Sequence, residues 1–359
     1  MRKTRVIQVL PTLSFGEGVG NDTLAIHEIL KRNGYKTHIY AETIGKRIPK
    51  DAASKISDMP KLKKDDVIIY HLAIGTRLNE MLDEFNGKKV IVYHNVTPPE
   101  FFEEYSLDHV RGCEEGLRGV NLLSTVADYC LADSEFNKQD LILAGYDCKI
   151  DVLPIIIPFS DYEKKPSQKV LKKYAGDDYT NILFTGRIVP NKKQEDVIRA
   201  FYHYQKNYNP KSRLFLVGSY NGMEIYYDRL KTYVEKLGVE NVIFTGHIGF
   251  DEILAYYNLA DLFLCMSEHE GFCIPLVEAM FFQIPIVAYQ GTGVTGTLNG
   301  AGLPVYEKNP LETAGLMNYL LKNTEIQRQV IENQNKRLAN FQTEKIEKQF
   351  LEYLNNFMD

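Results

Sequence analysis

The 359-residue sequence has few cysteines and no long apolar run. Its five cysteines form no CxxC pair and no metal-ligand spacing, so reduced thiols in a cytoplasm are the simplest interpretation. No segment reaches the length of a membrane span, and the apolar run behind the basic residues 1–5 is too short for a signal peptide. We therefore expect a cytoplasmic protein with at most peripheral association at the inner face of a membrane.

The chain also lacks a strong excess of charge of either sign. A net charge of -5 and a pI near 6.0 do not indicate nucleic-acid binding. Hydrophobic residues make up 44% of the sequence and charged residues 25%, which is typical of soluble globular proteins. Because a single hydrophobic core rarely grows to this size, the length predicts two domains.

Short β-branched runs alternate with helical segments along the whole chain. In the first half, strands are predicted at residues 6–10, 37–40, 67–72, 90–94, 129–133 and 149–153. In the second half, one strand begins at residue 181, and others are predicted at 213–218, 242–247, 262–266 and 285–289. This alternation predicts an α/β fold with mostly parallel sheets. Prolines flank the apolar residues 155–157, and a charged stretch without a pattern follows, so the linker is predicted within 155–180. We expect two Rossmann-like doubly wound domains, residues 1–158 and 180–342, facing a cleft.

Residues 267–280 connect the strand at 262–266 to a helix whose start is marked by Pro275. Glu270 lies in the short acidic turn, and Glu278 lies one turn inside the helix. Free N–H groups at a helix start favour a diphosphate, and carboxylates accept hydrogen bonds from hydroxyls. This chemistry suits a nucleotide sugar. The competing interpretation is that two glutamates merely favour the helix dipole.

Two basic residues follow the first strand of the second half. Arg187 can place its guanidinium fork on phosphate oxygens, and Lys192 can supply a compact positive charge. Together with the helix start after Cys273, they would neutralise a leaving diphosphate. Taken singly, each could equally be a surface cation on a solvated loop.

The first predicted strand leads into a loop with glycines at positions 16, 18 and 20, and a helix is expected from about residue 23 to residue 33. Gly16, Gly18 and Gly20 would let the backbone approach a ligand closely. The spacing is not GxGxxG, and no P-loop lysine follows. The missing GxGxxG and ribose-acid pattern disfavours a nicotinamide dehydrogenase. A flexible loop that only turns the chain fits equally well.

Histidines occur where two predicted strands end. His94 precedes the abrupt exit at Pro98 and Pro99, and a neutral imidazole there could hydrogen-bond a sugar hydroxyl or take its proton. A structural histidine that caps the strand end is the alternative. His71 is a weaker candidate of the same kind, since carboxyl ends of parallel strands are where such sheets bind ligands.

Residues 270–278 match the E-x7-E motif of the retaining glycosyltransferases of the GT-B fold, and the chain resembles glycosyltransferase family 4. The resemblance covers most of the length and is densest over 186–195, 242–248 and 260–300. It implies that Glu270 contacts the donor sugar and that Glu278 contacts the ribose. It also implies that Arg187 and Lys192 contact the diphosphate and that His94 contacts the sugar. The other implied donor contacts are the backbone amides of Gly271, Phe272, Cys273 and Ile274, the loop glycines Gly16, Gly18 and Gly20, and Gly186, Gly218 and His247.

Two departures from the family pattern accompany this resemblance. The adjacent glycine pair usual in the first loop is absent, and residues 155–158 replace the commoner ending of the linker. The resemblance also implies that the final helix returns to the first domain. The amphipathic segment 343–358, in the predicted C-terminal helix 343–359, fits that position.

The resemblance implies transfer of a hexose from a nucleotide diphosphate sugar to an acceptor hydroxyl with retention. The acceptor would be a glycan or a lipid-linked glycan of a bacterial surface polysaccharide, with mannose and GDP favoured slightly over UDP-sugars. No DxD triplet is present, so neither a metal nor any other cofactor is expected. A nucleotide-sugar epimerase of the same fold and a non-catalytic nucleotide-sugar-binding subunit are the alternatives.

Overall fold

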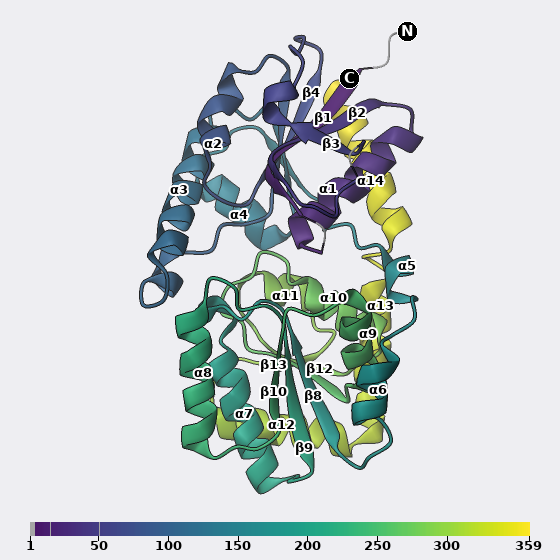
Figure 1. The fold of residues 1–359 in the computed structure, drawn as a ribbon. Coiled ribbons are helices and arrows are strands. Elements are labelled where there is room, and N and C mark those ends of the chain that lie inside the picture. The colour runs from purple at the N-terminus through teal and green to yellow at the C-terminus, as the bar shows by residue number, and fades with distance from the viewer. Residues whose placement is uncertain (1–3, 15, 50) are drawn as a thin grey trace. The chain divides into compact units, whose positions relative to one another are not determined.

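The computed structural model describes residues 4–14, 16–49 and 51–359 and divides into two compact domains, each built on a parallel sheet (Figure 1). The first domain comprises Met1–Glu100, Asp108–Pro158 and Phe341–Asp359, and the second comprises Phe101–Leu107 and Phe159–Asn340. The predicted α/β class, with two Rossmann-like domains, is confirmed. Among the described residues, no helix has the length and apolar content that a membrane crossing requires.

The first domain has a seven-stranded sheet in the order β3-β2-β1-β4-β5-β6-β7. Its strands are β1 (Arg5–Leu13), β2 (Lys36–Ile44), β3 (Ala53–Lys55), β4 (Val67–Leu72), β5 (Lys88–Tyr93), β6 (Tyr129–Ala132) and β7 (Lys149–Val152). Its helices are α1 (Gly18–Arg32), α2 (Arg77–Met81), α3 (Leu107–Leu123), α4 (Glu135–Leu143) and α14 (Thr343–Met358). The order reverses between β1 and β4, which is where open α/β sheets bind ligands.

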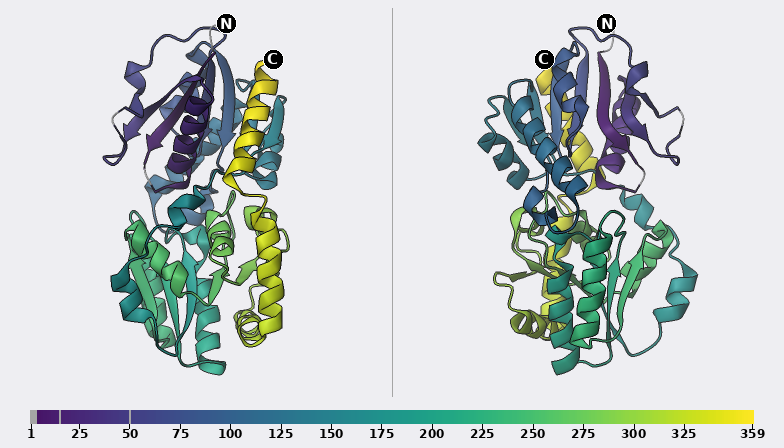
Figure 2. Two further views of the ribbon diagram at one scale, coloured as in Figure 1. Left: turned by 90° about the vertical axis from the view of Figure 1, so that its right-hand side faces the viewer. Right: turned by 60° about the vertical axis from the view of Figure 1, so that its left-hand side comes forward.

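Helices cover both faces of this sheet, because its central strands are apolar on both sides. Side chains of α2, α3 and α4 pack with one face, and side chains of α1 and α14 pack with the other. Ile346, Phe350 and Leu354 of α14 are buried against the strands, so the last helix completes the first domain (Figure 2). The apolar spacing of residues 343–358 is therefore a core-facing stripe.

The second domain has a six-stranded sheet in the order β10-β9-β8-β11-β12-β13. Its strands are β8 (Thr180–Thr185), β9 (Ser212–Val217), β10 (Val242–Gly246), β11 (Leu262–Cys265), β12 (Ile286–Tyr289) and β13 (Leu303–Val305). Its helices are α5 (Phe159–Tyr162), α6 (Gln168–Tyr174), α7 (Gln194–Asn207), α8 (Glu224–Leu237), α9 (Phe250–Leu259), α10 (Ile274–Phe281), α11 (Thr292–Leu298), α12 (Pro310–Lys322) and α13 (Thr324–Leu338). Here the order reverses between β8 and β11.

The start of α1 differs from the prediction. The helix begins at Gly18, not near residue 23, so Gly18 and Gly20 are helical and only Gly16 lies in the loop. A Cβ on Gly20 would lie 2.0 Å from the carbonyl oxygen of Ser14, so glycine is required by close packing of the helix on that backbone. Phe15, within the same predicted loop, lies outside the described residues. The short edge strands β3 and β13 were not predicted.

Candidate functional site

The reversal between β8 and β11 places two loops of the second domain side by side. These strands are hydrogen-bonded neighbours, with Ile182 opposite Leu262. The loop after β8 carries Arg187 and Lys192, and the turn after β11 carries Glu270. Because all strands are parallel, both loops leave the same edge of the sheet. The topology therefore brings together two stretches that are far apart in the sequence.

Lys192 and Glu270 form an ion pair at this edge. Lys192 Nζ donates to Glu270 Oε1 at 2.6 Å, and the side chains are 16% and 11% exposed. Burial alone would lower the pKa of Lys192, but the adjacent Glu270 carboxylate outweighs it and raises that pKa. Burial lowers the pKa of the neighbouring His269 to about 4, so that ring is neutral. The lysine is thus a charged group fixed at the strand ends.

Hydrogen bonds from two side chains and from the backbone fix the loop at Asn191 and the turn at Glu270. Asn191 Nδ2 donates to the carbonyl of His269 at 2.9 Å, and the Asn191 carbonyl accepts from the N–H of Glu268 at 2.9 Å. Thr292 Oγ1 accepts from the N–H of Glu270 at 2.8 Å and donates to its carbonyl at 3.0 Å. The ion pair therefore rests on a backbone that is fixed from two sides, and its geometry does not depend on its own charges alone.

The start of α10 has an unusual backbone conformation. Cys273, the residue before the helix, has φ +74°, a left-handed conformation that few side chains other than glycine adopt. Gly293 allows the turn to pack closely, because a Cβ there would lie 2.2 Å from the carbonyl oxygen of Gly271. The predicted donor contacts at Gly271, Phe272, Cys273 and Ile274 thus lie in one tight turn that leads into the start of α10.

Glu278 lies inside α10 and is held by two tyrosine hydroxyls. Tyr162 donates to Oε1 at 2.8 Å and Tyr257 donates to Oε2 at 2.5 Å. Since the hydroxyl hydrogen of Tyr257 points to the carboxylate, Thr185 is the donor in its 2.5 Å contact with Tyr257. Burial raises the pKa of Glu278, and the two hydroxyls oppose that rise only in part.

The other predicted donor residues of the second domain lie around the same strand ends. Arg187 is exposed and donates to the carbonyl of Asn221 at 3.4 Å, so its guanidinium is only weakly fixed. Gly186 and Gly218 have φ +138° and +157°, and a Cβ on Gly218 would lie 1.9 Å from the carbonyl oxygen of Gly186. Gly218 is needed for this close approach, and the positive φ at both positions favours glycine. His247 is exposed just after β10.

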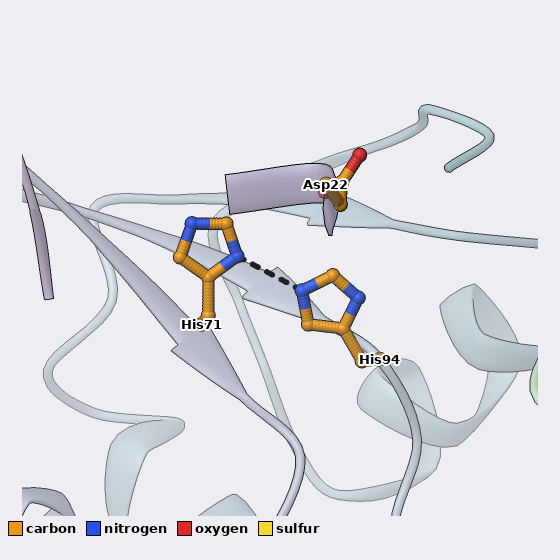
Figure 3. Close-up of side chains that lie close together, drawn as sticks. All are labelled: Asp22, His71 and His94. Carbon is orange, nitrogen blue, oxygen red and sulfur yellow. Dashed lines mark hydrogen bonds between the residues drawn. The ribbon is translucent and has the colours of Figure 1, made fainter. Parts of the chain in front are cut away.

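In the first domain, His71 and His94 belong to a chain of buried hydrogen bonds that crosses the reversal between β1 and β4. Gln8 Oε1 lies 2.9 Å from His71 Nε2, and His71 Nδ1 lies 2.9 Å from His94 Nε2 (Figure 3). His94 Nδ1 in turn lies 2.8 Å from Asp133 Oδ2. The side chains of His94 and Asp133 are each 2% exposed. Histidine and carboxylate side chains are thus linked across four strands, β1, β4, β5 and β6.

The proton positions along this series of hydrogen bonds follow from the orientation of the Gln8 amide at one end. Gln8 Nε2 donates to the carbonyl of Thr23 at 3.0 Å, so its Oε1 is the acceptor for an N–H on His71 Nε2. Burial lowers the pKa of His71 well below its usual value, so His71 is neutral and its Nδ1 accepts from His94 Nε2. His94 then carries a proton on each nitrogen when Asp133 is ionised.

The charge of His94 differs from the sequence prediction. Burial disfavours its imidazolium form, but the charge and hydrogen bond of Asp133 outweigh burial and raise the pKa of His94. This direction opposes the neutral imidazole that the sequence predicts at this position. Both ring nitrogens also have partners inside the domain, so the alternative of a structural histidine is well supported by the contacts.

Sequence reasoning missed the residues that hold the candidates in place. Asp133 was included in a strand and given no role, although it stands at a strand end like His71 and His94. Gln8, Asn191 and Thr292 had no signal of their own, because their importance depends on a partner distant in the sequence. Gly16 donates its N–H to Asn21 Oδ1 at 3.0 Å, so the remaining loop glycine is tied to α1.

Comparison with known families supports a glycosyltransferase. Residues 166–337, nearly all of the second domain, match the family model described as glycosyl transferases group 1. The O-antigen chain mannosyltransferase B of Escherichia coli is 27% identical over 225 residues, which cover 60% of this chain and 56% of that protein. An uncharacterized glycosyltransferase of Methanocaldococcus jannaschii is 31% identical over 163 residues, 45% of this chain and 40% of that protein. The chain spans about half the length of the curated relatives it matches.

Solved structures show the same fold over nearly the whole chain. The Anabaena protein HepE in complex with UDP and glucose has a TM-score of 0.77 and 20% identity, covering 98% of this chain and all of that chain. Sucrose-phosphate synthase from Thermosynechococcus elongatus also has a TM-score of 0.77, with 16% identity and 98% coverage of both chains. The fold is therefore GT-B. The fold and the family match together support a GT-B glycosyltransferase, and the relatives found include O-antigen mannosyltransferases.

Proposed function

We propose that this chain is a retaining glycosyltransferase of family 4 that moves a hexose from a nucleotide diphosphate sugar to an acceptor hydroxyl. The observation that carries the proposal is the largely buried Lys192–Glu270 ion pair at the reversal between β8 and β11. A buried cation beside a carboxylate offers one group for phosphate oxygens and one for sugar hydroxyls. The family match over 166–337 supports it independently.

In this proposal Lys192 and Arg187 hold the diphosphate, and the N–H groups at the start of α10 add to the positive potential. As the bond from the anomeric carbon to the phosphate oxygen breaks, negative charge grows on the diphosphate, and a fixed cation stabilises that charge. The acceptor oxygen bonds to the anomeric carbon on the same face, and its proton passes to the leaving phosphate oxygen. No metal takes part at the diphosphate, since the cations supply the charge.

Glu270 accepts a hydrogen bond from a donor sugar hydroxyl through the oxygen that Lys192 does not occupy. Glu278 accepts hydrogen bonds from the ribose hydroxyls, and Tyr162 and Tyr257 hold its carboxylate in the orientation for this. The backbone amides of the turn at Gly271 complete the donor contacts. The resemblance gives His94 a contact to the donor sugar, in which case a hydroxyl replaces His71 as the partner of Nε2.

The donor we propose is GDP-mannose, with a UDP-sugar as the next choice. The O-antigen mannosyltransferases among the relatives favour mannose, while the structural neighbour HepE binds UDP and glucose. The acceptor we propose is a glycan or a lipid-linked glycan of a surface polysaccharide.

A thermal-shift panel of GDP, UDP, ADP and dTDP tests the proposal first, because a ligand that binds the folded state raises Tm by mass action. We expect one nucleotide to raise Tm well above the others and Lys192→Ala to remove that shift. The selected nucleotide sugar, labelled in the sugar, is then incubated with and without candidate acceptors. Acceptor-dependent transfer supports the proposal, epimerisation without acceptor supports the isomerase, and binding with no turnover supports a binding subunit.

A further inference from the structure

We propose that Asp22, His71 and His94 of the first domain form a binding site for one divalent transition-metal ion of the Zn²⁺ type. One ligand atom from each residue can be chosen so that all three lie within 4.8 Å of one another. The residues come from α1, from β4 and from the loop after β5, and Figure 3 shows the two rings facing each other with Asp22 nearby. Three side chains from three elements thus surround one point inside a single domain.

Each of the three side chains is anchored through the atom that a metal would not use. The Nε2 atom of His71 is bonded to Gln8, and the Nδ1 atom of His94 is bonded to Asp133. Asp22 Oδ1 accepts from the backbone N–H of Ile156 at 2.9 Å, which leaves Oδ2 as the ligand atom. Metal-bound histidines usually have such outer partners, which fix the ring orientation and the tautomer.

A metal ion fits the existing hydrogen bonds of the two rings once the pair has lost one proton. At present that proton lies between His71 Nδ1 and His94 Nε2, which are 2.9 Å apart. If it leaves, both rings are neutral, each keeps an N–H directed to Gln8 or Asp133, and each presents a lone pair to the centre. The two lone pairs are then available to an ion, and neither ring has to flip or change its outer partner.

The ligand types select the class of ion. Two imidazole nitrogens and one carboxylate oxygen suit Zn²⁺, Co²⁺, Fe²⁺ or Ni²⁺, whereas Mg²⁺ and Ca²⁺ prefer oxygen ligands alone. The carboxylates of Asp22 and Asp133, both buried, can balance the two positive charges of the ion. Three protein ligands leave a fourth position for water or a substrate oxygen. No other such group occurs within 4–14, 16–49 and 51–359.

The proposed metal ligands all belong to the first domain, whereas the proposed diphosphate contacts Arg187 and Lys192 belong to the second. One consequence does rest on the proposed function: if His94 contacts the donor sugar through Nε2, a bound ion occupies that nitrogen and slows transfer. Failure of that inhibition would count against the sugar contact, whereas failure of metal binding itself would count against the site. The binding measurements below need no enzyme activity, so the two failures are distinguishable.

The test uses the full chain without a histidine tag, freed of metal with a chelator and dialysed. Co²⁺ is titrated while the visible absorption bands of the ion are recorded, and Zn²⁺ is titrated by calorimetry. We expect one ion per chain, cobalt spectra typical of nitrogen and oxygen ligands, and no saturable binding of Mg²⁺. Zn²⁺ should displace Co²⁺ from the same site. These measurements on the unaltered chain stand even where a variant fails to fold.

Four variants locate the site. His71→Gln and Asp22→Asn, which each remove one ligand, should weaken Zn²⁺ binding by at least about 100-fold. Asp133→Asn keeps all three ligands and the shape of the outer partner, and should weaken binding about 10–100-fold. His38→Gln is the matched control, since His38 lies in the same domain and bonds Ser54 instead. Circular dichroism and Tm show whether each variant is folded.

Three results would overturn the proposal. One is the lack of any saturable Co²⁺ or Zn²⁺ site on the unaltered chain. Another is a folded His71→Gln variant that binds Zn²⁺ as tightly as the unaltered chain. The third is loss of binding in His38→Gln, which would move the site to the other histidines of the domain. Equal affinity for Mg²⁺ would contradict the proposed class of ion.

Discussion

Glu270 and Glu278 stand at the two ends of one motif, yet their carboxylates have opposite surroundings. Glu270 is paired with a cation, Lys192, whose pKa it raises. Glu278 accepts hydrogen bonds from two neutral hydroxyls, and burial raises its own pKa. Two identical residues in one short stretch thus differ in what stabilises their charge.

The difference follows from the elements that face each residue. Glu270 lies in the turn after β11, beside the loop that follows the neighbouring strand β8, and that loop supplies Lys192. Glu278 lies one turn inside α10 and meets Tyr257 from α9 and Tyr162 from α5. A motif that fixes the spacing of two carboxylates therefore does not fix their electrostatics. We propose that Glu270, the ion-paired end of the motif, acts where charge develops on the donor. Glu278, the hydroxyl-bound end, is proposed to recognise the ribose.

The largest expected effect is that of Lys192→Ala at the paired end. Removing the cation leaves the growing charge on the diphosphate unstabilised, so we expect transfer to fall by at least about 100-fold. It also leaves Glu270 without its cation in a mostly buried place, at a cost of about 3 kcal/mol of folding stability. Initial rates and chemical denaturation measure the two effects. Lys193→Ala, one residue later, is the control and should change the rate less than about 3-fold. Near-normal rates in Lys192→Ala would remove the charge argument.

Glu270→Gln should have the next largest effect, because it keeps the shape of the side chain and removes its charge. We expect transfer to fall about 10–100-fold, since the amide cannot pair with Lys192 and accepts sugar hydroxyls more weakly. Steady-state kinetics over donor concentration make the measurement. Glu268→Gln, whose carboxylate pairs with Lys193 and Lys308 outside the proposed donor contacts, is the matched control. Equal losses in both variants would mean that general destabilisation is the cause.

At the hydroxyl-bound end, Tyr257→Phe tests whether tyrosines orient Glu278. The variant removes the hydroxyl that donates to the Glu278 carboxylate and accepts from the Thr185 hydroxyl. Folding stability should therefore fall by about 1–3 kcal/mol. The donor KM should rise several-fold with little change in kcat, because ribose binding is the same in the ground state and the transition state. Tyr256→Phe serves as the control, since that ring packs against Phe215 and not against Glu278. A pure kcat effect would contradict the binding role.

The pH dependence of stability tests the raised pKa of Glu278. A carboxyl group whose pKa is higher in the folded state than its ordinary 4.5 binds its proton more tightly when folded. Its contribution to stability is therefore present below pH 4.5 and is lost as the pH rises through the folded value. We expect the Tm of the unaltered chain, measured relative to that of Glu278→Gln, to decline as the pH rises above 4.5. A difference that grows with pH would mean that the pKa is lowered instead.

The smallest effect is expected for Cys273→Ala, which lies between the two glutamates. Both cysteine and alanine have a Cβ, so the left-handed backbone at φ +74° is equally strained in both. The proposed donor contact is the backbone N–H, which the substitution keeps, so the rate should stay within about 2-fold. Cys273→Pro, which removes that N–H and forbids the conformation, is the contrasting variant and should lose activity. A large loss in Cys273→Ala would assign the thiol a role.

The secondary structure was predicted best where a single pattern dominated. The apolar run at 67–72 is β4, and the amphipathic stretch 343–358 is α14, both with the predicted bounds. The prediction was wrong at Gly18 and Gly20, because glycine usually ends a helix. Contact with the Ser14 backbone explains the glycine at position 20. The edge strands β3 and β13 have three residues each, too short for a periodic signal.

The candidate site was predictable in its residue types but not in its partners. Lys192 and Glu270 were both singled out, yet nothing in the sequence joined them, and the 2.6 Å ion pair depends on β8 and β11 being neighbours. For His94 the sequence indicated a position at a strand end but not the pKa of the ring, which Asp133 raises. Hydrogen-bond partners from distant strands leave no local pattern.

By itself, the sequence determined the alternation of strands and helices, the fold class that follows from it, and the E-x7-E motif with its nearby cations, because these are local properties of side-chain period and spacing. Only the tertiary structure decided which charges meet: Lys192 with Glu270, two tyrosines with Glu278, and His94 between His71 and Asp133. The physical reason is that strand order selects neighbours across the sheet, and burial among those neighbours sets which groups carry charge.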